Sequence, residues 1–593
     1  MPLELTSAGR PVQLSPGTGV QLEWNSPLFD EDTMKGTFSY SLAVPAGPNG
    51  PLYGFPERPD GATAPGALLP AELSLAGLPL LSGRQRIKAA SPSKYTVNLQ
   101  DGLSGAGLSE RQLSSFAYGG LREVPRYVPL AGVPGTSAPG LTLHANAVVA
   151  SPADYDYVFA PLRNEYQATN SALPLVYPVP NTVNPWTVRP VPVLGMPAGG
   201  SFTYYIQLST GAPGSPVTDP WPPYCPFPKL RYVLQAICEE SGLAVDVAQL
   251  LPGELGELVI AGNAQLVDRG DAQTLRFSLA DVLPALTVAQ LLAALRQDLG
   301  VVVYVDPLSR RVRSARLSEQ VAPGAPYVDL SARLAGDPEV SIDDTPAGVT
   351  LTYQVDGDDA LTKDLLSQQP ASVGEPVATV ADLPATGPLL PSPPLPRLVL
   401  AEQVYYQAVA SYRDLTSVSL SWSRLVEALP PVLVAGGGEA QAMASCYTRE
   451  LATELQDASG VTLALPAISQ PPYRADQTAV ERSAVLRLLF YRGLQLASDG
   501  VMRCPQLSHQ SASGALSVRL GGAQGTYAQL LEAWLPFKRS AVSYQVPLLL
   551  TPLDLARLDL AQPLRLDGVA YLVRKLSATV PLQKPATAEL VRL

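Results

Sequence analysis

The chain has 593 residues, of which 46% are hydrophobic and 16% charged, so it can form several globular domains and is not disordered throughout. Acidic residues number 52 against 41 basic ones, and the net charge of −11 weighs against a sequence-specific DNA or RNA binder. The 60 Pro and 47 Gly residues disfavour long helices and uninterrupted central strands, because Pro lacks the N–H that both hydrogen-bond ladders need.

The first hundred residues have the pattern of β-strands. Thr37–Val44 alternates with a period of two, which predicts a half-buried strand with Phe38, Tyr40, Leu42 and Val44 on one face. Four more strands bounded by turn residues are predicted at Gln21–Trp24, Ala71–Ala76, Leu80–Ala89 and Lys94–Leu99. Ala46–Gly61 is so rich in Gly and Pro that we expect turns and no helix there.

Two amphipathic helices are predicted near the middle of the chain. The first carries apolar residues at helical spacing from Leu230 to Cys238 and ends at Gly242. The second runs from Val288 to Leu299 and ends at Gly300, with Thr287 and Gln290 placed for a capping box. A strand follows each helix, at Leu243–Val247 and at Val301–Val305. We therefore expect two α/β units that share one small sheet.

The second half of the chain begins with a Pro-dense stretch, Ser367–Leu398, which is typical of a linker or an extended surface arm. Strand-like alternation follows within Glu402–Val426, and a helix is predicted over Glu439–Leu455. Near the C-terminus, Thr551 and Pro552 indicate the start of a short helix that reaches Leu558. The last predicted elements are a hairpin of Leu564–Leu566 and Val569–Leu576 around Asp567-Gly568, and a closing strand, AELVRL.

The search for chemistry finds no phosphate-binding loop, no nucleophile elbow and no paired-His zinc motif. The four Cys residues, at 225, 238, 446 and 504, have no CxxC spacing, which gives no support to a zinc site or a disulfide framework. His144, in a stretch interpreted as a strand, and His509 are the only histidines. His509 lies near Cys504 in sequence, but a nucleophilic pair is defined in space, so we expect structural roles for both histidines.

Adjacent acids occur at Glu239-Glu240, Asp343-Asp344 and Asp358-Asp359, and we expect them on solvated surfaces because neighbouring residues point in different directions. We therefore predict no catalytic, cofactor-binding or metal-binding residues and no enzymatic activity. The aromatic stretches Tyr155–Tyr166 and Pro220–Phe227 could bind sugars or a partner, but such residues more often pack under loops or at subunit interfaces. No leader peptide or membrane-spanning run is evident, and a soluble protein made in the cytoplasm is expected.

Both ends of the chain resemble one family. The stretch Asn25–Asp60 resembles the opening pattern of a group of prophage tail proteins, and the stretch Leu548–Leu593 is similar to their closing pattern. The opening pattern is matched by Ser26-Pro27-Leu28-Phe29, Ser39-Tyr40-Ser41-Leu42, Pro45, Asn49, Leu52, Gly54 and Arg58. Leu28 and Leu42 stand where aromatic residues are more usual. The closing pattern is matched by Leu558, Asp559, Pro563, Gly568, Tyr571, Lys575, Glu589 and Leu590.

The resemblance implies the baseplate hub of phage tails, a homotrimer that adapts a sixfold tail tube to a threefold tip. It implies a mixed α+β, β-dominated fold with two tail-tube-like β-barrel domains and smaller α/β domains. The implied partners are the tail tube, the distal tail protein and the tape-measure protein, with genome DNA passing through without specific binding. The implied location is the virion tail tip, after assembly in the host cytoplasm, and the implied role needs no cofactor. A net charge of −11 is compatible with a channel that does not hold DNA.

Five regions are expected: an N-terminal β domain at 1–225, an α/β domain at 226–320, a β segment with the Pro-rich arm at 321–400, a mixed α/β region at 401–478 and a C-terminal β domain at 479–593. The side chains expected to serve the barrel sheets are Phe38, Tyr40, Leu42, Val569, Tyr571 and Val573. Two other readings stay open: a tail-associated cell-wall hydrolase, and a carbohydrate-binding adhesin of the tail tip that uses the Tyr- and Trp-rich loops.

Overall fold

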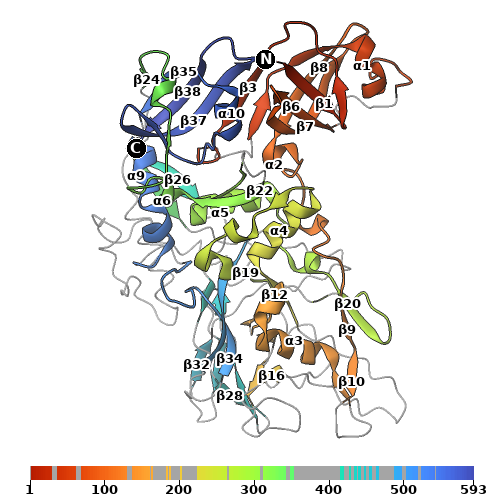
Figure 1. The fold of residues 1–593 in the computed structure, drawn as a ribbon. Coiled ribbons are helices and arrows are strands. Elements are labelled where there is room, and N and C mark those ends of the chain that lie inside the picture. The colour runs from red at the N-terminus through yellow and green to blue at the C-terminus, as the bar shows by residue number, and fades with distance from the viewer. Residues whose placement is uncertain are drawn as a thin grey trace.

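A computed structural model gives the arrangement of the chain. It describes residues 2–29, 36–61, 68–129, 137–160, 162–163, 182–184, 186–188, 201–202, 224–262, 266, 268–306, 311–341, 348–352, 415–419, 426–428, 433–436, 439–442, 446–448, 453–456, 462–465, 486–496, 503–518, 523–540 and 542–593. Strands dominate these residues and helices are short, so the fold is mixed and β-dominated as predicted (Figure 1). The Pro-dense stretch 367–398 lies outside them.

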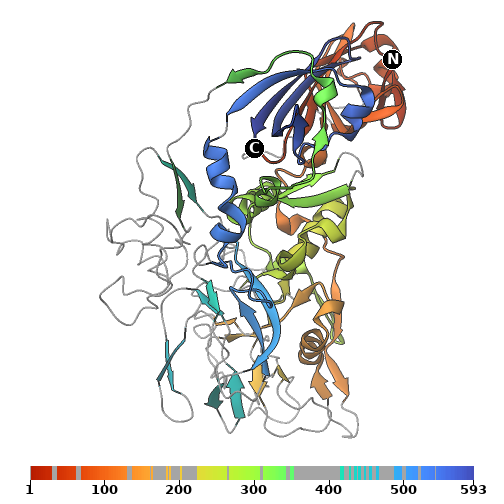
Figure 2. The ribbon, with the colours of Figure 1, turned by 60° about the vertical axis from the view of Figure 1, so that its left-hand side comes forward.

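The largest sheet brings the two ends of the chain together (Figures 1 and 2). Its path is β2 (Arg10–Val12), β1 (Leu3–Ser7), β6 (Leu68–Leu75), β7 (Leu78–Ala90), β8 (Lys94–Asp101), β4 (Thr37–Ser39), β3 (Val20–Asn25), β37 (Val569–Val580), β38 (Ala586–Arg592), β35 (Ser543–Leu548) and β24 (Glu339–Ser341). Off this path are β5 (Leu42–Pro45), β36 (Leu564–Leu566) and β23 (Val328–Asp329). Among the described residues the path from β2 to β24 does not close on itself, so no closed barrel is seen there.

The large sheet has two halves, one running along the path from β2 to β3 and the other from β37 to β24. The joint between these halves is the antiparallel pair β3–β37. Its register runs from Val20 opposite Val580 to Asn25 opposite Lys575. One apolar cluster extends across both halves, with Leu22 and Leu576 fully buried within it. Burial of a continuous apolar face across the joint stabilises the halves together, because the hydrophobic effect scales with the apolar area removed from water.

The predicted strand Thr37–Val44 is interrupted. Phe38 pairs with Gln100 in β8, whereas Leu42 pairs with Val97, so four residues on one strand oppose three on the other. Such a bulge reverses the direction of the following side chains. Leu42 and Val44 are therefore buried, whereas Tyr40 is 44% exposed and Phe38 half-buried, and the expectation that Tyr40 serves the core is wrong.

The C-terminal predictions are confirmed in most details. The hairpin of β36 and β37 turns at Asp567 and Gly568, both of which have positive φ as a type I′ turn requires. Tyr571 and Val573 are buried as expected, and Val569 is half-buried. The helix α10 (Pro552–Arg557) begins at Thr551, whose side chain accepts a hydrogen bond from the Asp554 N–H.

Below the large sheet lies a central α/β layer, in which the prediction of two α/β units on one small sheet is confirmed. The helices α4 (Leu230–Glu240) and α5 (Val288–Leu299) each lead through a glycine into a strand, β18 (Ala244–Val245) and β21 (Val301–Val305). Both strands flank β22 (Arg311–Arg316) in one three-stranded sheet. The capping box of Thr287 and Gln290 is present.

The part of the chain farthest from the large sheet is rich in aromatic rings and shares one apolar core with the central α/β layer. It is built from β9 (Arg122–Pro125), α3 (Gly140–Ala150), β12 (Tyr157–Val158), β17 (Phe227–Pro228), β19 (Leu258–Ile260), β20 (Thr274–Phe277), β33 (Leu488–Leu496) and β34 (Arg503–Ser508). The strands β19, β33 and β34 form one three-stranded sheet.

The remaining described elements are short. The helices are α1 (Ala46–Tyr53), α2 (Gly102–Gly105), α6 (Leu317–Gln320) and α9 (Trp534–Ser540). The strands are β10 (Tyr127–Pro129), β11 (Ser137–Pro139), β13 (Leu162–Arg163), β14 (Thr182–Val183), β15 (Trp186–Val188), β16 (Ser201–Phe202), β25 (Gly348–Thr352), β26 (Leu415–Ser419), β27 (Val426–Ala428), β28 (Leu433–Gly436), β29 (Glu439–Ala442), β30 (Cys446–Thr448), β31 (Thr453–Gln456) and β32 (Thr462–Leu465).

Three segments differ from the sequence-based expectation. Ala46–Tyr53 is a helix despite its prolines, since buried Asn49 exchanges hydrogen bonds with the Gln13 backbone and Gly54 ends the helix in the left-handed conformation. The segment around His144 is helix α3, because its buried residues Leu141, Ala145, Val148 and Val149 recur at helical spacing. The helix expected over 439–455 is wrong: β29 pairs antiparallel with β28, and the strands β30 and β31 follow.

Candidate functional site

One face of the large sheet is apolar and the other is mostly polar, and this second side, the polar face, is the first candidate surface. Along β3, Leu22 and Trp24 point into the core, while Gln21 and Glu23 alternate with them on the other side. Serine, threonine and amide side chains recur on the polar side of the neighbouring strands, such as Ser577 opposite Glu23 and Thr579 opposite Gln21. Near the central layer this side also carries apolar residues, since Leu572 of β37 is fully buried in a second apolar cluster. Where hydroxyl, amide and charged side chains dominate, the face has little apolar area to bury and can line a water-filled space.

Ion pairs hold the polar face at the joint of the halves. The Lys575 ammonium on β37 lies 2.6 Å from the Glu23 carboxylate on β3, and the Tyr40 hydroxyl donates to the same carboxylate at 2.7 Å. The hydrogen bond to Glu23 raises the pKa of Lys575 and also that of Tyr40. A second pair joins Arg574 to Glu589 at 3.0 Å. Lys575 and Glu589 belong to the closing pattern, and their role is to pair strands.

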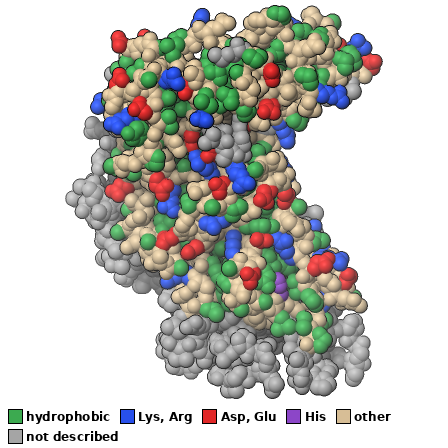
Figure 3. Space-filling view, in the orientation of Figure 1, with side chains coloured by type: hydrophobic (Ala, Val, Ile, Leu, Met, Phe, Trp, Pro, Cys, Tyr) green, Lys and Arg blue, Asp and Glu red, His purple; other side chains and the backbone are tan. Residues whose placement is uncertain are grey.

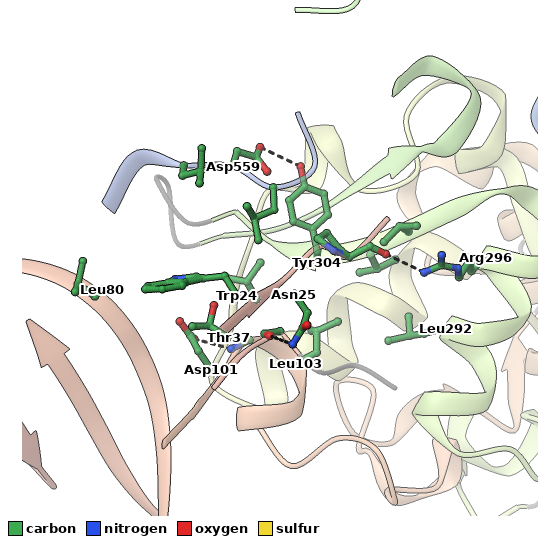
Figure 4. A pocket seen from close by; sticks show the side chains of 18 of the residues that line it. Trp24, Asn25, Thr37, Leu80, Asp101, Leu103, Leu292, Arg296, Tyr304 and Asp559 are labelled. Atoms are coloured by element: carbon green, nitrogen blue, oxygen red, sulfur yellow. Dashed lines mark hydrogen bonds between the residues drawn. The ribbon is translucent and has the colours of Figure 1, made fainter. Parts of the chain in front are cut away.

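A cavity of about 160 Å³ lies where the large sheet meets the central layer (Figure 4). Trp24, Leu80, Leu103 and Leu292 supply apolar walls, and Asp101 and Asp559 bring carboxylates to its lining. The lining is therefore mixed, with both apolar and charged side chains.

Two arginines of the central layer contact the large-sheet part of the chain across the boundary between them, which we call the seam. Arg296 on α5 donates to the backbone carbonyls of Pro27 and Leu28, which directly follow β3. Arg313 on β22 contacts the Asp559 carboxylate, and also lies 2.9 Å from the Asp306 carboxylate. Pro27, Leu28 and Asp559 belong to the two end patterns, so both patterns are attached to the same central layer.

The two histidines have structural surroundings. His144 Nε2 lies 2.6 Å from the Tyr157 hydroxyl, and burial lowers the pKa of His144. Burial also lowers the pKa of His509 to about 4, and its Nδ1 faces the Ser517 hydroxyl at 3.3 Å. The side chain of Cys504 lies outside the described part, so the suggested Cys504–His509 pair is not tested.

The other residues considered from the sequence are packed or paired where the structure describes them. The thiols of Cys225 and Cys238 are buried, and burial raises the pKa of Cys238 to about 12. The Glu240 carboxylate accepts hydrogen bonds from the Ala117 and Tyr118 backbone N–H groups. The pairs Asp343-Asp344 and Asp358-Asp359 lie outside the described residues. Within the described ranges, no three His, Cys, Asp or Glu side chains are grouped as a metal site.

The described parts of the two aromatic stretches are packed. Tyr157, Phe159, Tyr224 and Phe227 are each at most 2% exposed. Tyr157 and Phe159 make an edge-on ring contact in the aromatic core. Figure 3 shows acidic and basic side chains interspersed on the face in view. Of the helices that the structure describes, none is both long and apolar enough to span a membrane.

Comparisons with known proteins find little. No family model matches the chain, and no curated protein matches it. Among solved structures, the crystal structure of the prophage MuSo2 43 kDa tail protein from Shewanella oneidensis is similar with a TM-score of 0.31 and 8% sequence identity. That alignment covers 99% of this chain and 95% of the other. A TM-score of this size lies below the range of shared folds.

Proposed function

We propose that this chain is a structural protein of a bacteriophage tail, and specifically a homotrimeric hub at the tail tip. In this role the chain has no enzymatic activity. It contacts the tail tube, the distal tail protein and the tape-measure protein, and genome DNA passes along its axis without sequence-specific binding.

The observation that carries the proposal is the pairing of the two end patterns. The opening pattern includes the residues that follow β3, and the closing pattern includes β37 and β38. These segments are more than 500 residues apart in sequence, yet β3 and β37 are neighbours over six residue pairs. The residues of both patterns cap helices, form turns and pair strands, which supports a protein that works through its shape.

The two halves of the sheet suggest how three chains could match sixfold symmetry. Each half has its own outer strands, β2 and β1 on one side and β35 and β24 on the other, and the halves meet at β3 and β37. Three chains would then place six sheet halves around an axis. We propose that each half is one tail-tube-like barrel unit, closed by contacts with neighbouring chains that cover exposed strand edges.

The polar face is the side proposed to line the channel. The opposite face is covered by a core that includes residues of both halves and of α10. Around β3 and β37 the charged groups of this face are paired with one another, so that part of the wall gives DNA little to bind, because nonspecific binding to DNA needs unpaired cations.

Mass photometry of the purified full chain tests the proposal. Three copies of the 62.6 kDa chain have a mass of about 188 kDa, and a threefold ring in negative-stain images at that mass supports the hub. A uniformly monomeric chain that binds a glycan array would favour the adhesin instead. Clearing of peptidoglycan in a zymogram, absent from a mock purification, would overturn the non-enzymatic assignment.

A further inference from the structure

One strand of the polar face carries a row of cations. Arg84, Arg86 and Lys88 lie at alternate positions of β7, and the residues between them, Gln85 and Ile87, are buried. Alternate residues of a strand share a face and are spaced by about 7 Å. Arg86 and Lys88 are exposed and Arg84 is half-buried, so the three form a basic row on the face away from the core. Lys88 stands at a bulge, because the register of β7 against β8 shifts between Ile87 and Ala89.

This basic row differs from the two neighbouring cations of β37, Arg574 and Lys575. On β37, Lys575 is paired with Glu23 and the neighbouring Arg574 with Glu589. No carboxylate within the described ranges forms an ion pair with any of the three cations of the row. The residues opposite them on β8 are neutral amides, Gln100 facing Arg84 and Asn98 facing Arg86.

We propose that the basic row of Arg84, Arg86 and Lys88 contacts the phosphate backbone of double-stranded DNA. The inference rests on the proposed function, in which this face lines the DNA channel. Guanidinium groups suit phosphate because their planar donors can bind two oxygens at once. Hydroxyl and amide side chains beside them, Ser82 and Asn98, add donors of the kind that commonly contact DNA phosphates.

The surroundings favour a nucleic acid over an acidic protein as the partner. Protein interfaces have an apolar, usually aromatic core and are depleted in Lys. Beside the row, among the described residues, Leu68 opposite Arg86 is the only large aliphatic side chain that is well exposed, at 43%. A single leucine does not make such a core, whereas a line of charge in a polar surface matches a phosphate backbone.

The contact is expected to be weak and salt-sensitive, so that the DNA can move. Three phosphate contacts give a slope of about −2.7 in a plot of log affinity against log salt, and the affinity falls about 40-fold between 50 and 200 mM salt. Sequence plays no part, because phosphates carry no base information.

The test measures binding of a fluorescent 30-base-pair duplex of random sequence to the full-length chain by anisotropy, at salt concentrations from 20 to 200 mM. The variant R84Q/R86Q/K88Q removes the basic row. The control R10Q/R557Q/K584Q removes the same charge at three exposed positions outside it. We expect the row variant to lose at least tenfold in affinity at 20 mM salt and most of the salt slope, and the control to stay within about twofold of the parent protein.

Three results would overturn the proposal: no binding by the parent chain at 20 mM salt, equal losses in the row variant and the control, or displacement of the duplex by polyglutamate as effective as by unlabelled DNA. Mass photometry on the same samples separates this inference from the hub. A trimer that does not bind the duplex contradicts the row alone, and a monomer that binds through it contradicts the hub alone.

Discussion

The variant Leu22→Ala at the joint of the sheet should lower stability and speed amide exchange in both halves. Leu22 is 0% exposed in β3 and faces Ala578 of β37 and Ser39 of β4. Truncation of a buried Leu costs about 2–5 kcal/mol, through lost burial and the remaining cavity, and we take about 3 kcal/mol here. If both halves open as one unit, this loss speeds amide exchange in them about 150-fold, because each 1.4 kcal/mol is a factor of ten in the opening constant.

Hydrogen exchange with peptide-level detection measures this effect. Peptides from β3 and from β37–β38 should accelerate together, although they come from opposite ends of the chain. The matched control is Leu553→Ala on α10, where the side chain is 42% exposed and the expected loss is below about 0.5 kcal/mol. Faster exchange in β3 with no change in β37 and β38 would refute the idea that the two halves are one cooperative sheet.

Three further predictions concern single positions. Burial lowers the pKa of His509 to about 4, so the unfolded state binds the proton more tightly and stability falls as pH drops below about 6.5. The loss should reach about 2 kcal/mol between pH 7.5 and pH 5 in denaturant titrations, and His509→Gln should flatten that pH dependence. Gly300→Ala should destabilise the protein by at least about 2 kcal/mol in thermal melts, because φ is +58° and a Cβ would lie 2.8 Å from the Leu530 carbonyl oxygen. The control Gly242→Ala has φ +79° and open space around the Cβ, and should cost about 1 kcal/mol in the same melts. Thr551→Ala should cost about 1 kcal/mol by loss of the N-cap, and an unchanged melting temperature would contradict the capping role.

Elements with strong local signals could be predicted from the sequence. The capping box at Thr287 and the turn at Asp567-Gly568 specify their conformations through hydrogen bonds and φ values that involve only neighbouring residues. The helix at Ala46–Tyr53 could not be found in this way. It depends on hydrogen bonds between Asn49 and Gln13, which are 36 residues away in sequence.

Other differences had a signal that was open to two interpretations. The segment around His144 is apolar enough to match both the alternating pattern of a strand and the repeat of a helix. The spacing of Leu141, Ala145 and Val148 would have favoured the helix. The exposure of Tyr40 follows from a bulge against β8, which depends on pairing across the sheet.

The surface features proposed to carry function were largely beyond sequence reasoning. Arg84, Arg86 and Lys88 alternate visibly in the sequence, but only the structure shows that these three cations form no ion pair with a carboxylate among the described residues. The contacts across the seam are even harder to predict from the sequence, since Arg313 and Asp559 are 246 residues apart. Such pairs form through the topology of the whole chain and not through local pattern.

Electron cryomicroscopy of an assembled tail that contains this chain tests the proposed hub. We predict three copies in a ring on the tail axis, with the polar face of β3, β7 and β37 toward the channel. A position away from the axis, a copy number other than three, or a channel lined by the opposite face of the sheet would contradict it.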